Sequence, residues 1–202
     1  KTYAGAPVVI LSGKEAGNTL LIGAELQYGK DQKIDFDYIV VDSELKEINS
    51  GKTTLPILRT GKSTGLSSVY QYGHDGNLYI KSYVRMTKEE KKAAKKGETR
   101  SYSVLSIIDV ASAEIDVYTM KFDGLNIYNF NLVTDESGVR LYGFFNDVAK
   151  DPSGSRTHGI FYSTIQGRTM GTPNFSYFDK ATLDELFKTD AEERRKTDSK
   201  RK

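Results

Sequence analysis

The sequence predicts an all-β protein made of three four-stranded antiparallel repeat units, and three observations support this prediction. Similar strand-like segments follow glycine-containing turns at three places, and aligning Ile22, Ile80 and Tyr142 gives steps of 58 and 62 residues. Apolar and polar residues alternate in these regions with the period of two that a half-buried strand requires. The turn Asp75-Gly76-Asn77 carries the Asp-Gly signal of a β-hairpin. A fixed period of this kind indicates units that bury their apolar faces on one another.

The first unit is expected at about residues 1–60. Its clearest strand is the segment in which Ile34, Phe36 and Tyr38 alternate with charged residues, so that one face is apolar. We expect four strands at residues 7–11, 20–26, 34–42 and 45–48.

The second unit is expected at about residues 61–122, with strands at 66–70, 78–86, 102–109 and 115–122. A lysine-rich excursion, Thr87 to Thr99, separates its second and third strands. We expect this excursion to be solvated and to contain a short helix that ends at Gly97, because glycine favours helix C-termini.

The third unit is expected at about residues 123–178, with strands at 126–133, 140–146, 157–165 and 174–178. Residues 179–202 should form a short helix and a charged tail or linker. Asp179 is the candidate N-cap, and Leu183, Leu186 and Phe187 lie on one face of the helix.

Four-stranded units of about 60 residues suggest blades of a β-propeller. Closed propellers typically need 4 to 8 blades, whereas this sequence supplies three. We therefore expect a partial propeller, from a longer protein, with a curved three-unit assembly or a β-sandwich as alternatives.

Three short segments near the end of the chain, residues 141–147, 151–154 and 159–162, resemble uncharacterised bacterial cell-envelope proteins with β-propeller-like repeats. The charged continuation Glu192 to Lys196 resembles the insertion that precedes another repeat in such proteins. The resemblance covers about the last third of the chain. It implies architecture and a secreted, periplasmic or cell-surface location, but no functional residues.

Composition limits the possible functions. The 202 residues are 38% hydrophobic and 28% charged, with no cysteine and a formal net charge of +2. Disulfides and cysteine-ligated metals are therefore excluded. The positive charge lies in the tail from Lys188 to Lys202, and the nearly neutral remainder argues against a basic nucleic-acid-binding face. No apolar run is long enough for a transmembrane helix, and the start at Lys1 without a leader fits a processed or excised chain.

Two segments imitate a phosphate-binding loop, Gly61-Lys62-Ser63 and Gly51-Lys52-Thr53. The motif requires a further glycine five residues earlier and a helix afterwards. Pro56 and Lys46 occupy the required positions, so we interpret both segments as surface loops.

Candidates for catalysis or metal binding are few. The two histidines, His74 and His158, are expected to cap or solvate turns, and no nucleophile elbow is present. Asp35 and Asp37 share one strand face, where paired carboxylates could bind calcium or act as acid and base. A solvated strand face is the simpler interpretation.

A loop near the end of the third unit is the better calcium candidate. It combines Asp147 and Asp151 with the possible oxygen ligands Asn146 and Ser153. Its spacing does not match an EF-hand loop. The sequence therefore predicts no metal ligand, no catalytic residue and no cofactor.

The aromatic residues, 13 Tyr and 9 Phe without Trp, concentrate in the third unit. We expect most of them to pack between blades, because such rings bury large areas; an exposed ledge for a glycan or a peptide is the alternative. The cluster comprises Tyr128, Phe130, Tyr142, Phe144, Phe145, Phe161, Tyr162, Phe175, Tyr177 and Phe178.

The function predicted from these features is a non-enzymatic binding or scaffold module of the bacterial cell envelope, with an envelope protein or a glycan as partner. The alternative is part of a propeller-type glycoside hydrolase or lyase completed by blades outside this chain, with Asp35, Asp37 and Asp147 as local candidates. A third possibility is an assembly partner that uses the lysine-rich segment Lys88 to Lys96 as a contact.

Overall fold

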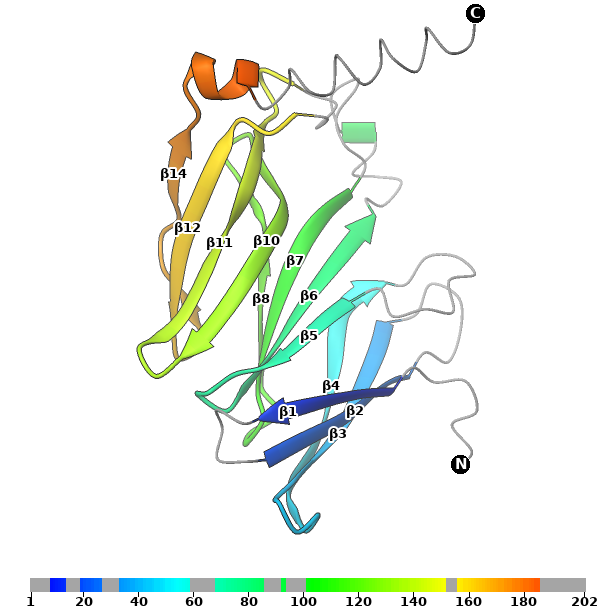
Figure 1. The fold of residues 1–202 in the computed structure, drawn as a ribbon. Helices are drawn as coiled ribbons and strands as arrows, with labels where there is room; N and C mark the ends of the chain where they lie inside the picture. The colour runs from blue at the N-terminus through cyan, green and yellow to red at the C-terminus, as the bar shows by residue number, and fades with distance from the viewer. Residues whose placement is uncertain are drawn as a thin grey trace, which may run out of the picture.

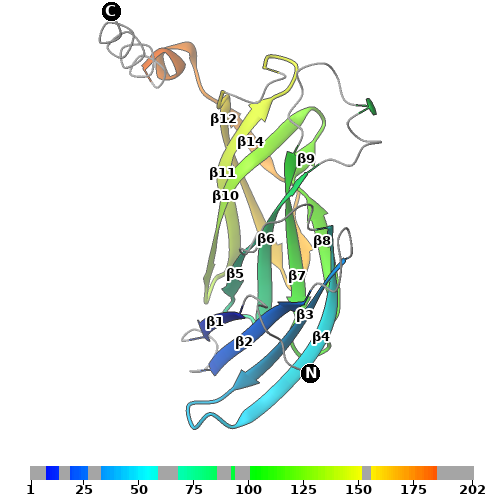
Figure 2. The ribbon, with the colours of Figure 1, turned by 90° about the vertical axis from the view of Figure 1, so that its right-hand side faces the viewer.

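Three antiparallel sheets stand in a row and form an all-β structure, seen from two sides in Figures 1 and 2. In Figure 1 the third sheet is at the left, the second is in the middle and the first is at the lower right. The computed structural model describes residues 8–13, 19–26, 33–58, 68–85, 92–93, 101–151 and 156–185.

The first sheet has the strand order β1-β2-β3-β4. Its strands are β1 (Val8–Gly13), β2 (Thr19–Leu26), β3 (Lys33–Val41) and β4 (Glu47–Leu58). The predicted alternation in β3 is present, since Ile34, Phe36 and Tyr38 are buried.

The prediction for β4 was wrong in its extent. Leu45 lies in a turn at a φ of 62°, and the strand runs on through the Gly51-Lys52-Thr53 segment that was interpreted as a surface loop. Gly51 suits this position because its missing side chain leaves room for the Tyr38 ring, while Thr53 and Thr54 are β-branched and favour strands.

The second sheet has the order β5-β6-β7-β8 and is covered on both faces. Its strands are β5 (Ser68–Tyr72), β6 (Asn77–Arg85), β7 (Ser101–Asp109) and β8 (Ile115–Thr119). Residues 103–108 of β7 are all buried. A strand between two other sheets has no solvated face, so Val104 and Ile108 enter one core, Leu105 and Ile107 enter the other, and Ser103 and Ser106 are buried with them.

The third sheet has the order β13-β12-β11-β10-β9, with β14 also paired to β12. Its strands are β9 (Lys121–Phe122), β10 (Leu125–Asp135), β11 (Gly138–Asp147), β12 (Gly159–Gln166), β13 (Thr169–Met170) and β14 (Asn174–Tyr177).

The third sheet therefore has six strands, not the four predicted. The predicted strand 115–122 divides at buried Met120, and its last two residues form β9 in the third sheet. The expected last strand is preceded by β13 on the same edge of β12, with Pro173 just before β14. Proline lacks the amide hydrogen that a strand ladder needs, so an interruption is expected there.

Two apolar cores lie on opposite sides of the second sheet. Leu78 and Ile80 of β6 pack with Phe36 and other residues of the first sheet. Tyr79 of β6 packs with Phe145 and other residues of the third sheet. Neighbouring residues of one strand thus belong to different cores, and the second sheet joins the other two.

Hydrogen bonds supplement the contact between the first and second sheets. The Tyr38 hydroxyl donates to the Val110 carbonyl at 2.9 Å, and the Asn49 side-chain amide donates to the same oxygen at 2.5 Å. The Tyr70 hydroxyl donates to the buried carboxylate of Glu25. These bonds satisfy polar groups that would otherwise be costly to bury.

The helix expected after the third sheet is described over residues 180–185. Asp179 caps it as predicted, because its side chain accepts the Thr182 amide at 2.7 Å. Leu186, Phe187 and the charged tail lie outside the described residues. So does the lysine-rich excursion, apart from Lys92 and Ala93, which are helical and exposed.

Candidate functional site

The outer face of the third sheet carries large apolar side chains that neither of the other two described sheets covers. Tyr142 pairs with Tyr162 across β11 and β12, and Phe144 pairs with Ile160 in the same register. These four side chains are 42–47% exposed. Phe178 adds its ring, 6.4 Å from that of Phe144 between centroids. We call Tyr142, Phe144, Ile160 and Tyr162 the outer face.

The opposite face of these strands behaves as predicted for aromatic residues between sheets. Phe145 and Phe161 are buried, and the rings of Phe175 and Tyr177 lie 5.3 and 5.0 Å from Phe145 between centroids. Phe175 and Tyr177 therefore share a strand face, as the alternation predicted. The side chain of Tyr128 is not among those that the structure describes. A register shift between Ile127 and Asn129 interrupts the alternation of side chains at that point of β10.

A cavity of about 500 Å³ opens beside the outer face, where turns of the second and third sheets meet. Asp75, from the turn between β5 and β6, lines one part of it. Residues 137–140 and the end of β12, including Tyr162 and Gln166, line the rest. We call this cavity the turn pocket.

The side chains of the turn pocket are held in place by neighbouring groups. The Asp75 carboxylate accepts the Asn77 side-chain amide at 2.9 Å and the Tyr79 hydroxyl at 2.5 Å. The Arg140 guanidinium pairs with Asp135. Burial, followed by the hydrogen bond to Asp75, raises the pKa of the Tyr79 phenol far above its usual range, so Tyr79 stays a donor.

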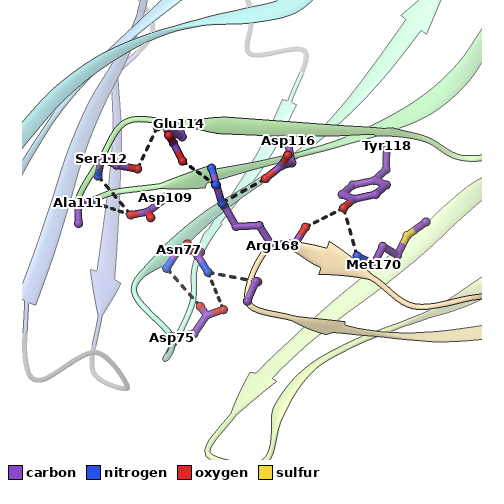
Figure 3. A network of polar contacts seen from close by, with 11 residues as sticks. Asp75, Asn77, Asp109, Ala111, Ser112, Glu114, Asp116, Tyr118, Arg168 and Met170 are labelled. Carbon is purple, nitrogen blue, oxygen red and sulfur yellow. Dashed lines mark hydrogen bonds and ion pairs between the residues drawn. The ribbon is translucent and has the colours of Figure 1, made fainter.

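The turn between β12 and β13 is fixed to the second sheet by the polar network in Figure 3. Arg168 reaches to Glu114 at 2.7 Å and to Asp116 on β8 at 3.1 Å. The Tyr118 hydroxyl donates to the Arg168 carbonyl at 2.8 Å and accepts the Met170 amide at 3.2 Å. The turn between β12 and β13, which forms one wall of the turn pocket, is therefore held in place by side chains of the second sheet.

The predicted carboxylate pair is on the outer side of the first sheet, away from the turn pocket. Asp35 and Asp37 lie on the strand face opposite to buried Phe36, and Lys52 bridges them at 3.1 and 3.7 Å. Hydrogen bonds from Thr54 and then Lys52 lower the pKa of the Asp35 carboxyl. These contacts describe a solvated strand face.

The predicted calcium loop uses its carboxylates to hold its own turn. Asp147 accepts the Ala149 amide at 3.0 Å and the Tyr177 hydroxyl at 3.1 Å. Asp151 accepts the Arg156 amide at 2.9 Å. Among the described residues, no three His, Asp or Glu side chains are grouped to hold a metal ion.

The Asp147 carboxylate is expected to make the free energy of unfolding depend on pH in the acid range. Burial alone would raise its pKa, but the bonds from Tyr177 and the amides of Ala149 and Lys150 outweigh burial and lower it. Its folded pKa thus lies below the unfolded value of about 3.9. Its contribution is complete above that value and is lost as the pH falls through the folded pKa.

Asp147→Asn is therefore expected to destabilise the protein at neutral pH but to flatten the decline in unfolding free energy as the pH falls below about 4. Urea unfolding at several pH values measures this. A parallel decline in variant and wild type would contradict the assignment.

The two histidines are far apart. His158 precedes β12, where its ring nitrogen Nδ1 accepts the Asp147 amide at 3.2 Å. His74 is exposed in the β5–β6 turn, whose Asn77 contacts Gly167 beyond the other end of β12. The length of β12 separates them by roughly 25 Å, so they form no common site. Gly61-Lys62-Ser63 lies outside the described residues.

The structure does not bring Asp35 and Asp37 together with Asp147, because the second sheet lies between them. Of the residues around the turn pocket, the sequence singled out only Tyr162, as a member of the aromatic cluster. Asp75 was interpreted only as part of a hairpin turn and Arg140 only as part of a strand, while Gln166 lies just after the expected strand 157–165. Nothing in their spacing indicates that three separate turns converge.

Fold and site together define an all-β protein of stacked antiparallel sheets with an apolar end face and a pocket of mixed polar and apolar lining beside it. No known protein family matches this chain, and neither does any curated protein or solved structure. Among the described residues, no helix has the length and apolar character needed to span a bilayer.

Proposed function

We propose that this protein is a non-enzymatic binding or scaffold module of the bacterial cell envelope, built from propeller-like sheets. The observation that carries the proposal is the half-exposed outer face of the third sheet. Contiguous apolar patches of this kind mark interaction surfaces. The cell-envelope location rests on the sequence resemblance of residues 141–162.

A further antiparallel β-sheet is the partner that fits the outer face. Both faces of the second sheet are covered by sheets, through side chains that alternate along its strands. The outer face continues this series with four alternating side chains in two cross-strand pairs. Fully burying an exposed Phe or Ile side chain contributes about 1.5 to 3 kcal/mol. Phe144 and Ile160 are already more than half buried, so each would gain about half of that under an apolar sheet.

In a solution of the purified protein, a second copy of the chain supplies the sheet that can pack on the outer face. We therefore expect the protein to self-associate more as its concentration rises. The double substitution Phe144→Ser with Ile160→Ser should lower the association constant at least tenfold, about 1.4 kcal/mol. Sedimentation velocity over a concentration series measures this. Val69→Ser is the matched control, since Val69 is 66% exposed on β5 outside the outer face.

Two results would count against the proposal. A wild type that stays monomeric throughout the series, with unchanged behaviour of the double variant, would remove the outer face as a docking surface. Turnover of common glycan, ester or peptide substrates that a single carboxylate or histidine substitution abolishes would instead favour the glycoside hydrolase or lyase alternative.

A further inference from the structure

The turn pocket is separate from the outer face in its chemistry, although the two meet at Tyr162. Around the pocket are a carboxylate, a guanidinium, a side-chain amide and hydroxyl groups, supplied by Asp75, Arg140, Gln166 and Thr164. Its volume of about 500 Å³ lies within the range of small-molecule sites, about 300 to 1,000 Å³.

The charges around the pocket favour a neutral ligand. Arg140 is already paired with Asp135, and the Asp75 carboxylate already accepts bonds from Asn77 and Tyr79. An anion would meet the carboxylate of Asp75, and a cation would meet the guanidinium of Arg140. A ligand without charge meets neither repulsion.

The polar groups favour a ligand that both donates and accepts hydrogen bonds at many points. A carboxylate accepts at about four lone-pair sites, a guanidinium offers five donors, and an amide such as Gln166 does both. The contacts already made leave further capacity on Asp75 and Arg140. Vicinal hydroxyl groups use such a mixture fully, because each hydroxyl is donor and acceptor at once.

The Tyr162 ring adds an apolar surface to this polar set. It is 44% exposed and lines the pocket beside Thr164. The face of an aromatic ring carries partial negative charge, which attracts the polarised C–H bonds on one side of a pyranose ring. Stacking on Tyr162 and bonding to the polar groups can therefore occur together.

The pocket is also rigid before any ligand arrives, which lowers the entropy cost of binding. Asn77 donates to the Gly167 carbonyl at 3.4 Å, and Arg168 anchors the same turn to β8. In the adjacent turn between β10 and β11, the Ser137 amide donates to Asp135 at 2.9 Å. Each of the three turns around the pocket is thus held by a contact within itself or with a neighbouring element.

We propose that the turn pocket binds a neutral saccharide, with a sugar ring against Tyr162 and its hydroxyl groups bonded to Asp75, Arg140 and Gln166. This inference rests on the proposed binding function and names its ligand class.

The test is titration of the ¹⁵N-labelled protein with neutral tetrasaccharides of glucose, xylose, mannose and N-acetylglucosamine, followed by NMR. We expect at least one to shift the amide resonances of Gly138 and Gly167 saturably. Gln166→Ala and Thr164→Ala should each weaken binding several-fold, up to about tenfold, as expected for a lost hydrogen bond. Thr119→Ala is the matched control, because Thr119 is likewise an exposed strand threonine but lies on β8.

The proposal is overturned if none of the neutral tetrasaccharides binds, or if Gln166→Ala and Thr164→Ala bind as wild type does. Tighter binding of tetragalacturonic acid or inorganic phosphate than of every neutral sugar would overturn it as well. Phe144→Ser with Ile160→Ser separates the two proposals: it should weaken association without weakening saccharide binding, because neither residue lines the pocket. Association without sugar binding would refute this inference alone.

Discussion

Phe36→Ala is expected to lower the free energy of unfolding by about 3 to 5 kcal/mol, the usual cost of emptying a buried phenylalanine site. Phe36 is fully buried between the first and second sheets. Its ring stacks on Tyr70 at 5.4 Å and on Tyr38 at 6.2 Å between centroids. The cavity would therefore lie in the middle of the core that joins these sheets.

Gly23 provides a second, coupled test of the same site. A β-carbon at Gly23 would overlap Cζ of Phe36 and lie 3.0 Å from Cε1 and Cε2 of that ring. Gly23→Ala alone should cost about 1 to 3 kcal/mol through overpacking. In the Phe36→Ala background the ring is gone, so the same substitution should cost much less.

Chemical denaturation of the four proteins in this double-mutant cycle measures the coupling. Gly171→Ala is a useful control, because the nearest atom there is a threonine side-chain oxygen at 3.3 Å. Additive effects of Gly23→Ala and Phe36→Ala would show that the ring does not lie over Gly23.

Gly159→Ala is expected to release β14 from the third sheet and to cost about 3 kcal/mol or more. The added methyl group would overlap the Ser176 carbonyl oxygen and lie 2.6 Å from Cε1 of Phe145. The Ser176 oxygen belongs to the backbone of β14, so it can move only if that strand moves. Phe145 is buried and cannot yield freely.

Hydrogen exchange distinguishes local release from general destabilisation. Amides of residues 174–178 should lose protection in Gly159→Ala, whereas those of β6 and β7 should keep theirs under native conditions. An equal loss of protection in all three sheets would contradict local release of β14.

Strands with one buried face could be predicted from the sequence, because their side chains alternate between two environments. β3 is the clearest case: Ile34, Phe36 and Tyr38 are buried as the pattern indicated. β4 was cut short because Gly51-Lys52-Thr53 has the composition of a loop. Only the Tyr38 ring, which comes from the neighbouring strand, explains the glycine at position 51.

The candidate sites show even more clearly that local sequence patterns miss features formed by residues far apart in the chain. Asp35 with Asp37, and Asp147 with Asp151, attracted attention because they are close in sequence, but each is occupied by its own turn or strand neighbours. The turn pocket combines Asp75, Arg140 and Gln166, which are far apart in sequence. Local spacing cannot indicate a site that forms only when sheets pack together.

The all-β class, the recurrence of strand segments and the capped helix after the third sheet could be predicted from the sequence, because alternation and capping act between near neighbours. Only the packing of the sheets shows that the second sheet is buried on both faces, where the third sheet gains strands and where the polar turns converge. These features depend on contacts between sheets, such as Tyr38 with Val110 and Arg168 with Glu114, which no local pattern records.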